Sequence, residues 1–246
     1  MAPRAPISAA CYIRCVLLHS LACVCSNVRC SLSSVCAVTS SQLAEPSYTC
    51  VEWVDLTVTS TKGARGSSAL VHLDADGHRR EYDFLFWEAV TTVGVLHAFA
   101  IRRDHAICFG RDELARGGLH DLLMAQGLNS AEATEMATHW LPYMASAPYV
   151  VIDFLPSSVL DQRAQLRVTP PPELMLRVFM LFCPVIHHVP GMRVTRDASD
   201  AAAEVAHPCA GRPRPAWTVV EWGGMECALV PARTLSPSEH EMPTGT

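Results

Sequence analysis

The sequence predicts an α+β fold in which mostly antiparallel β-sheet layers carry one inserted helical hairpin, at about residues 111–144. Three observations lead to this prediction. Alternating or β-branched runs occupy both halves of the chain. A segment with helical periodicity and helix-boundary residues lies between them. Hydrophobic residues make up 50% of the 246 residues, which is enough to bury a sizeable core.

The first half of the domain is expected to consist of strands joined by tight turns. Residues 48–59 and 69–74 are rich in β-formers and predict two strands. Asp76-Gly77 predicts a hairpin turn, because glycine accepts the positive φ of a tight turn. The returning strand, residues 79–88, is apolar on both faces, so we expect it at the centre of a sheet with both faces covered.

The middle of the chain predicts two helices. The first carries leucines at helical spacing, two glycines that weaken its middle, and Gly127 as the residue after its end. Asn129 followed by Glu132 is the pattern of a capping box, which begins a second helix. That helix is expected to end at about Trp140, because Pro142 limits it.

Strands return in the second half of the domain. Residues 149–155 and 174–185 are apolar runs of strand length. Arg177 is the only charge in the longer run, so we expect it to have an acidic partner or a path to solvent, since an unpaired buried charge is very costly. Residues 216–230 predict a last pair of strands around Gly223-Gly224.

We divide the chain into a leader (residues 1–41), one α+β domain (residues 48–230) and a polar tail (residues 231–246). The leader has a basic start, an apolar run and a small-residue exit, which is typical of a signal peptide cleaved after Ala37. We therefore expect a secreted or cell-surface protein. Arg14 interrupts the apolar run, so a poorly structured leader or a wrongly assigned start is an alternative, and a membrane anchor is disfavoured.

Several classes of function lack support in the sequence. The formal net charge is −5 and no run of basic residues occurs, which argues against a nucleic-acid partner. Neither glycine-rich nucleotide motifs, nor the spacing of a metalloprotease, nor a serine-hydrolase motif is present. We expect no metal and no cofactor. The expected partner is an unknown protein or carbohydrate, with membrane association only through the leader.

The chain has 11 cysteines, and six of them fall in the leader. The others are too widely spaced for a zinc site or a disulfide-dense scaffold, although one or two bridges are open to an exported protein. Because the domain has an odd number of cysteines, disulfide pairing within it would leave at least one free thiol. The cysteines of the domain are Cys50, Cys108, Cys183, Cys209 and Cys227.

Two stretches combine aromatic rings with acids, residues 82–88 (YDFLFWE) and residues 219–224 (VVEWGG). In each stretch a glutamate adjoins a tryptophan. The tryptophans can form a platform for a sugar ring or a peptide, with the glutamates as polar contacts. Core packing of the rings and ion pairing of the acids are the alternatives. The candidate binding residues are Trp87, Glu88, Glu221 and Trp222.

We therefore predict a non-enzymatic, exported or surface-associated interaction module that uses an aromatic patch with acidic neighbours. The first alternative is a hydrolase that acts through Glu88 and Glu221, since paired carboxylates carry out glycoside hydrolysis. The second alternative is a structural domain without a discrete site. Burial of both tryptophans favours the structural alternative, and carboxylates that converge in an open cleft favour the hydrolase.

The order of four motifs, Y-x-F-L-F-W-E, W-L-P-Y-M, R-V-F-M and V-V-E-W-G-G, resembles a family of uncharacterised, often exported or lipid-anchored proteins of bacteria and some microbial eukaryotes. The resemblance covers about Trp53 to Cys227. It implies that Phe84–Glu88, Trp140–Met144 and Val219–Gly224 belong to one domain. It implies no catalytic residues, because the family has no assigned activity.

Overall fold

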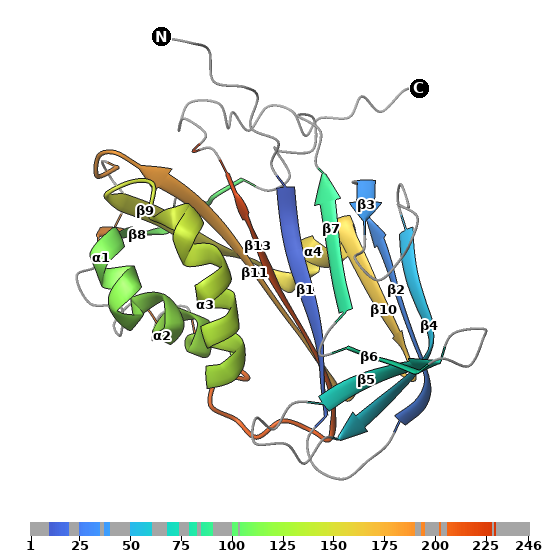
Figure 1. The fold of residues 1–246 in the computed structure, drawn as a ribbon. Coiled ribbons are helices and arrows are strands. Elements are labelled where there is room, and N and C mark those ends of the chain that lie inside the picture. Colours follow the sequence, from blue (N-terminus) through green and yellow to red (C-terminus); the bar gives the residue numbers. More distant parts are fainter. Residues whose placement is uncertain are drawn as a thin grey trace, which may run out of the picture.

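The computed structural model confirms the α+β class (Figure 1). It describes the backbone of residues 10–19, 25–34, 37–39, 50–60, 68–73, 79–82, 85–90, 100–102, 104–189, 193–194, 202, 206–227 and 229. Before residue 100, side chains are described only for Ser31, Arg79 and Leu85. The predicted Asp76-Gly77 turn and the tail of residues 231–246 lie outside the described residues.

The larger sheet has eight strands in the described chain, in the order β12-β8-β9-β11-β13-β1-β7-β3. Its pairs are antiparallel except β8 with β12 and β11 with β13, which run parallel. The strands are β12 (Arg193–Val194), β8 (Ile107–Gly110), β9 (Tyr149–Leu155), β11 (Leu174–Val185), β13 (Trp217–Glu226), β1 (Ala10–His19), β7 (Leu85–Val90) and β3 (Ala37–Thr39).

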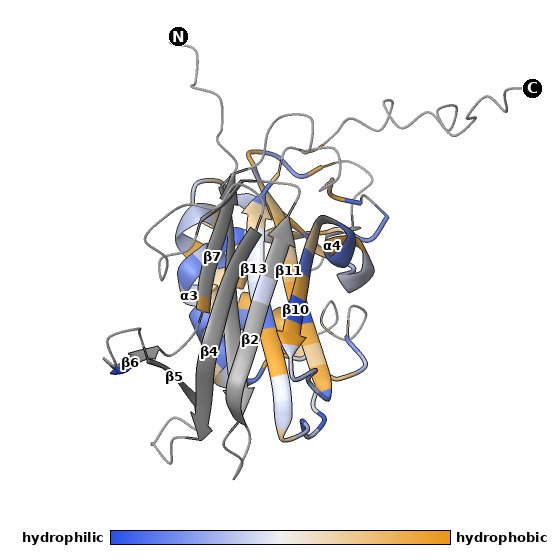
Figure 2. Ribbon diagram, turned by 90° about the vertical axis from the view of Figure 1, so that its right-hand side faces the viewer, coloured by the Kyte–Doolittle hydropathy of each residue, from blue (hydrophilic) through white to orange (hydrophobic). Residues whose placement is uncertain are grey.

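The smaller sheet is antiparallel throughout its described strands, in the order β10-β2-β4-β5-β6. Its edge strand β10 alternates between buried and exposed residues, and Figure 2 shows the same alternation in hydropathy. One face of β10 is therefore covered and the other meets solvent. The strands are β10 (Ala164–Thr169), β2 (Cys25–Ser34), β4 (Cys50–Ser60), β5 (Ser68–Leu73) and β6 (Arg79–Tyr82).

Two predicted strands differ from the structure. The single strand expected over residues 79–88 is divided: β6 belongs to the smaller sheet and β7 to the larger one. The strand pair expected over residues 216–230 is one strand, β13. Gly223-Gly224 does not turn the chain. A Cβ atom at Gly224 would lie 2.8 Å from the Met180 carbonyl oxygen and 3.1 Å from the Trp140 ring, so glycine permits close packing here.

Helices occupy the segment that the sequence assigned to them, with one difference in shape. The first helix is not continuous, because Gly117 has a φ of 120° inside a π-helical stretch. Glycine tolerates this angle, which other residues rarely adopt. The segments are α1 (Arg111–Glu113), η2 (Leu114–Gly118), α2 (Leu119–Ala125), α3 (Ser130–Met144) and α4 (Ser157–Arg163).

The predicted boundaries between α2 and α3 are confirmed. Gly127 has a φ of 94° just after α2. The Glu132 backbone N–H donates to Asn129 Oδ1 at 3.0 Å, and the Asn129 N–H donates to Glu132 Oε2 at 2.8 Å, which completes the capping box. The predicted end of α3 is wrong, because the helix continues through Pro142 to Met144.

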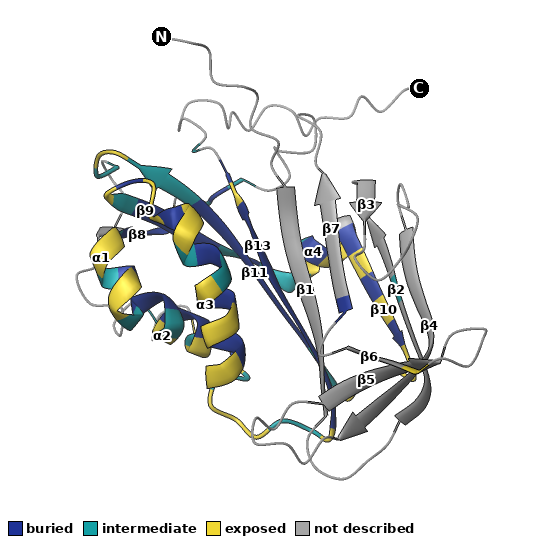
Figure 3. Ribbon diagram, viewed as in Figure 1, coloured by how far each residue is buried: buried dark blue, intermediate teal, exposed yellow. Residues whose placement is uncertain are grey.

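The main core lies between α2, α3 and one face of the larger sheet, where the buried residues gather in Figure 3. Trp140 of α3 packs edge-on against Phe182 of β11, with ring centroids 5.4 Å apart. Helix α4 contacts β10 and the opposite face of β11. Both faces of β13 are covered, and nine of its ten residues are buried for that reason.

The segment predicted as a leader takes part in both sheets. β1, from the apolar run, pairs with β13 from Tyr12↔Gly224 to His19↔Trp217 and with β7 on its other side. β2 pairs with β4 and β10. Cleavage after Ala37 stays a prediction, but the described strands β1, β2 and β3 pair with strands of the domain. No helix among the described residues is long and apolar enough to cross a bilayer.

Candidate functional site

Residues 85–88 of the first aromatic–acidic stretch and residues 219–224 of the second lie in the same sheet, on either side of β1. Cys15 of β1 is the register partner of both Glu221 and Leu85, and Ile13 is the partner of both Gly223 and Trp87. One intervening strand separates the stretches by roughly 10 Å. The side chains of Trp87 and Glu88 lie outside those that the structure describes, so a binding role for them stays a prediction.

Trp222 and Glu221 do not form a surface patch. The Trp222 residue is only 2% exposed and belongs to the core between the helices and the sheet. Glu221 is 1% exposed. For this pair, core packing and ion pairing replace the predicted aromatic patch. Because both faces of β13 are covered, Trp222 is buried whichever face it occupies, and its large ring adds apolar area to the core.

Glu221 forms an ion pair with Arg177, which lies directly opposite it on β11. Arg177 Nε donates to Glu221 Oε2, and Nη1 donates to Asp161 Oδ1 of α4 at 2.5 Å. The expectation that Arg177 has an acidic partner is confirmed. Burial alone would lower the pKa of Arg177, but its attraction to Glu221 and its hydrogen bonds to both acids raise that pKa overall.

This arrangement does not support catalysis by Glu221. A general acid or base has to exchange a proton with a substrate within hydrogen-bond reach. Glu221 instead neutralises a guanidinium whose side chain is only 2% exposed. The pair is structural in the sense that removal of one partner leaves an uncompensated buried charge.

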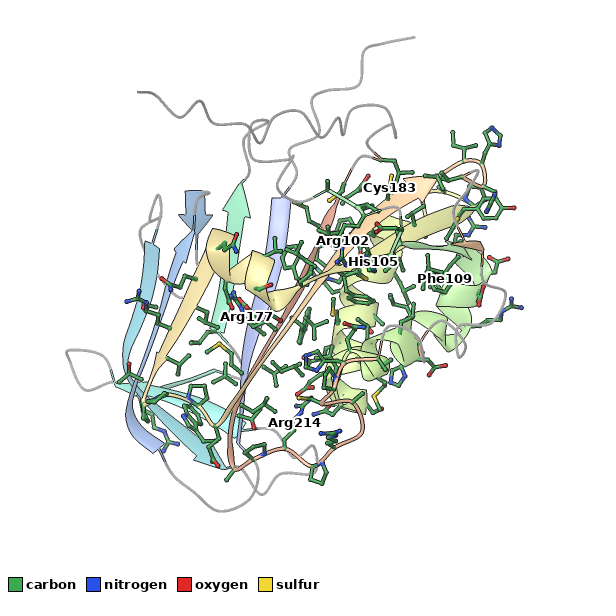
Figure 4. All side chains as sticks on the ribbon, turned by 180° about the vertical axis from the view of Figure 1, so that it is seen from behind. Arg102, His105, Phe109, Arg177, Cys183 and Arg214 are labelled. Carbon is green, nitrogen blue, oxygen red and sulfur yellow. The ribbon has the colours of Figure 1, made fainter. Side chains whose placement is uncertain are left out.

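A different part of the larger sheet carries a pocket of about 200 Å³, where β8 begins and β9 ends. Five apolar and four polar residues line it, and two of the polar ones, Arg102 and His105, lie close together in Figure 4. The apolar walls come from Ile107, Phe109, Leu122, Ile152 and Phe154. The polar lining comes from Arg102, His105, Gln126 and Asp153.

Asp153, which also lines the pocket, fixes the position of Arg102 through three hydrogen bonds. Arg102 Nε and Nη2 donate to the two Asp153 oxygens at 3.0 and 2.7 Å, and the Arg102 backbone N–H donates to Oδ2 at 2.9 Å. Nη2 also donates to the Phe154 carbonyl at 2.7 Å. The hydrogen bond to Asp153 raises the pKa of Arg102 against the effect of desolvation. The Arg102 side chain is 37% exposed, whereas the Asp153 side chain is 2% exposed. The guanidinium is therefore bound to a buried carboxylate and is itself partly open to solvent.

Arg102 lines the pocket with one guanidinium nitrogen that neither Asp153 nor Phe154 binds. Within the described part of the chain, Nη1 has no hydrogen-bond partner. The charge of Arg102 is already balanced by Asp153, and Asp104 adds a second carboxylate that acts on it. His105 is exposed and lies 3.5 Å from Asp104. Arg102 can therefore donate a hydrogen bond at the pocket, while nearby carboxylates offset its positive charge.

A second cavity, about 530 Å³, is a shallow apolar groove between α1, η2 and the end of α3. Leu114, Leu141 and Met144 contribute to it, with Thr138 and Pro142 beside them. Because proline has no N–H, Pro142 leaves the Thr138 carbonyl without its helical partner. Nothing in the structure indicates what would cover this groove.

In the described ranges, no three His, Cys, Asp or Glu side chains are placed to hold a metal ion. Desolvation by burial raises the pKa of Cys108, which adjoins two pocket residues, so this thiol is a poor nucleophile near neutral pH.

No protein-family model, curated protein or solved structure matches this chain. The family resemblance of its motifs stays a prediction. Sequence reasoning did not find the Arg102 pocket. Its one signal was Asp153, the only charged residue in the apolar run of β9.

Proposed function

We propose that the protein is a non-enzymatic binding domain that takes a small uncharged molecule in the Arg102 pocket. The molecule has an apolar body and one hydrogen-bond acceptor. The observation that carries the proposal is the position of Arg102: Asp153 fixes two of its nitrogens, and Nη1 is left for a ligand beside five apolar side chains.

The size of the pocket limits the ligand. An apolar cavity of about 150 Å³ accommodates a benzene ring. A pocket of about 200 Å³ therefore suits one ring, or an aliphatic body of similar size, with a small polar group. The phenyl rings of Phe109 and Phe154 favour a flat apolar body, because aromatic rings pack well edge to face or offset.

The charge of the pocket favours a neutral ligand over an anion. Arg102 provides one positive charge, whereas Asp153 and Asp104 provide two negative ones close to it. A ligand carboxylate would gain one hydrogen bond from Nη1 and would meet a region that is already negative. A carbonyl oxygen gains the same hydrogen bond without that repulsion.

The test is a binding series with three ring compounds of similar size: benzamide, benzoate and toluene. We expect benzamide to bind at least 10-fold more tightly than either of the others in calorimetric or NMR titrations, since a hydrogen bond to a charged group is worth about 1.5–3 kcal/mol. In NMR, benzamide should shift the resonances of Phe109 and Ile107. Equal affinity for all three compounds, tighter binding of benzoate, or no binding would contradict the proposal.

Arg102→Lys provides the matching variant. Lysine keeps the charge that Asp153 needs, but it cannot present a fixed third nitrogen to the pocket. Benzamide should bind at least several-fold more weakly while the fold is retained. Arg167→Lys on the exposed face of β10 is the control, and its affinity should match that of the original chain.

A further inference from the structure

Two cysteines lie opposite each other at the end of the parallel pair β11–β13. The register of this pair ends at Phe182↔Glu226, so the next residues along the strands are Cys183 and Cys227. The Cys227 N–H still donates to the Phe182 carbonyl at 2.8 Å. In a parallel ladder, the matching bond would run from the N–H of residue 184 to the Cys227 carbonyl.

Pro184 explains why the ladder stops there. Proline has no N–H, so the second bond of this bridge cannot form. The two cysteines are therefore adjacent across the strands. Only one of the two backbone hydrogen bonds of a regular parallel bridge forms between their segments. This combination allows the small adjustment that a new covalent link requires.

The spacing suits a disulfide. Neighbouring strands lie about 4.8 Å apart, and the Cα atoms of a disulfide lie about 4.4–6.8 Å apart. The structure holds both cysteines as thiols, with Cys227 buried and Cys183 partly exposed. Cys108 is one strand further away, because Val151 of β9 is the register partner of both Cys108 and Cys183. At roughly 10 Å, Cys108 is beyond the reach of a direct bond.

The electrostatics of the two thiols agree with this placement. Burial raises the pKa of Cys183, and burial together with the nearby Cys183, Glu226 and Asp153 raises the pKa of Cys227 to about 12. Both are therefore thiols near neutral pH. Air oxidation will be slow, and exchange with an existing disulfide is the effective route.

We propose that Cys183 and Cys227 are a disulfide-forming pair that locks the ends of β11 and β13 together when the protein meets a disulfide oxidant such as oxidised glutathione. The partly exposed Cys183 thiolate attacks the glutathione disulfide, forms a mixed disulfide and releases one glutathione thiolate. The Cys227 thiolate then attacks the Cys183 sulfur and releases the second glutathione. Two cysteine thiols are oxidised, one glutathione disulfide is reduced to two thiols, and the protons pass to the solvent.

The bond would change how the larger sheet is held. β13 is the strand that connects β11 to β1, and its end at Glu226 is the exposed one. A covalent link beyond Glu226 prevents this end from separating and removes conformations from the unfolded chain. The proposal is independent of the ligand proposed for the Arg102 pocket.

The experiment uses the full chain, equilibrated at pH 8 in buffers of reduced and oxidised glutathione, then quenched with acid and alkylated. Peptide mapping by mass spectrometry should show Cys183 linked to Cys227, with a loss of about 2 Da. The midpoint of urea unfolding should be higher for the oxidised protein than for the reduced one. Cys183→Ser should abolish both the link and the difference in midpoint.

Cys108→Ser is the matched control, because it removes a buried thiol from the same row of the sheet without touching the pair. It should leave the Cys183–Cys227 link intact. The proposal fails if both thiols are alkylated in the folded protein after full equilibration with the oxidant. It also fails if Cys183 is found linked to any cysteine other than Cys227. Both results come from the original chain, so they do not depend on the folding of a variant.

Discussion

Arg177 and Glu221 face each other across the parallel strands β11 and β13, and their side chains form an ion pair buried from solvent. Asp161 of α4 binds the same guanidinium from a position that is 54% exposed. The ion pair therefore joins two central strands and a helix of the face opposite α3.

Glu221→Gln should destabilise the fold by about 3–5 kcal/mol, because it leaves the Arg177 charge buried with one partner at the surface. The free energy of unfolding, from urea titrations followed by circular dichroism, measures this loss. Glu226→Gln, at the exposed end of the same strand, should change it by less than about 0.5 kcal/mol. Similar losses for both variants would show that the ion pair has no special role.

Gly224→Ala should destabilise the fold by about 1–3 kcal/mol, because the added methyl group would lie 2.8 Å from the Met180 carbonyl oxygen and 3.1 Å from the Trp140 ring. Gly110→Ala is the control, since nothing lies within 4 Å of the place that its methyl group would take and its φ of −69° suits any residue. Thermal melts of the two variants measure the difference. A melt of Gly224→Ala that equals that of Gly110→Ala would contradict tight packing of α3 on β13.

Stability should fall as the pH rises above about 9. The pKa of Cys227 is about 12 in the folded protein, mainly because of burial. An unfolded thiol has a pKa of about 8.5, so the unfolded state loses its proton first. The contribution of this thiol is fully present below the unfolded pKa and is lost as the pH rises toward the folded one, by up to about 1.4 kcal/mol per pH unit.

Unfolding free energies at pH 7, 9 and 10.5 under reducing conditions test this dependence. Cys227→Ser should reduce the slope above pH 9, since a serine hydroxyl does not titrate there. The thiols of Cys108 and Cys183 have pKa values raised by burial and will keep part of the slope. An identical slope in the variant would mean that Cys227 is accessible to solvent.

A chain that begins at Val38, as cleavage after Ala37 would produce, should not melt cooperatively. It lacks β1, which is the shared partner of β13 and β7, and β2, which is the shared partner of β4 and β10. Exposed strand edges of this kind also promote aggregation. Circular dichroism melts and gel filtration of residues 38–246 check the prediction. A native-like melt would show that the sheets do not need these strands, and N-terminal sequencing of the exported protein tests the cleavage itself.

Local patterns in the sequence predicted the elements with clear physical signals. The ranges 149–155 and 174–185 coincide with β9 and β11, because apolar runs of strand length are typical of buried strands. The capping box at Asn129 and the positive φ of Gly127 were predicted for the same reason: each depends on one or two side chains close in sequence.

Features that depend on tertiary contacts could not be predicted from local sequence patterns. Nothing in the residues around Gly224 indicates that Trp140, far away in the sequence, packs against it. The role of Glu221 depends on its register with Arg177, which sequence alone does not give. The Arg102 pocket is formed by residues from β8, β9, α2 and the segment before β8, and only the folded chain brings them together.

The position of β1 has a consequence for the order in which the protein is made. β1 is the first described strand to leave the ribosome, and its neighbour β13 is the last. During synthesis the apolar β1 therefore lacks its partner β13 until nearly the whole chain has emerged. A nascent segment of this kind is a natural target for chaperones, and the larger sheet can close only after translation is almost complete.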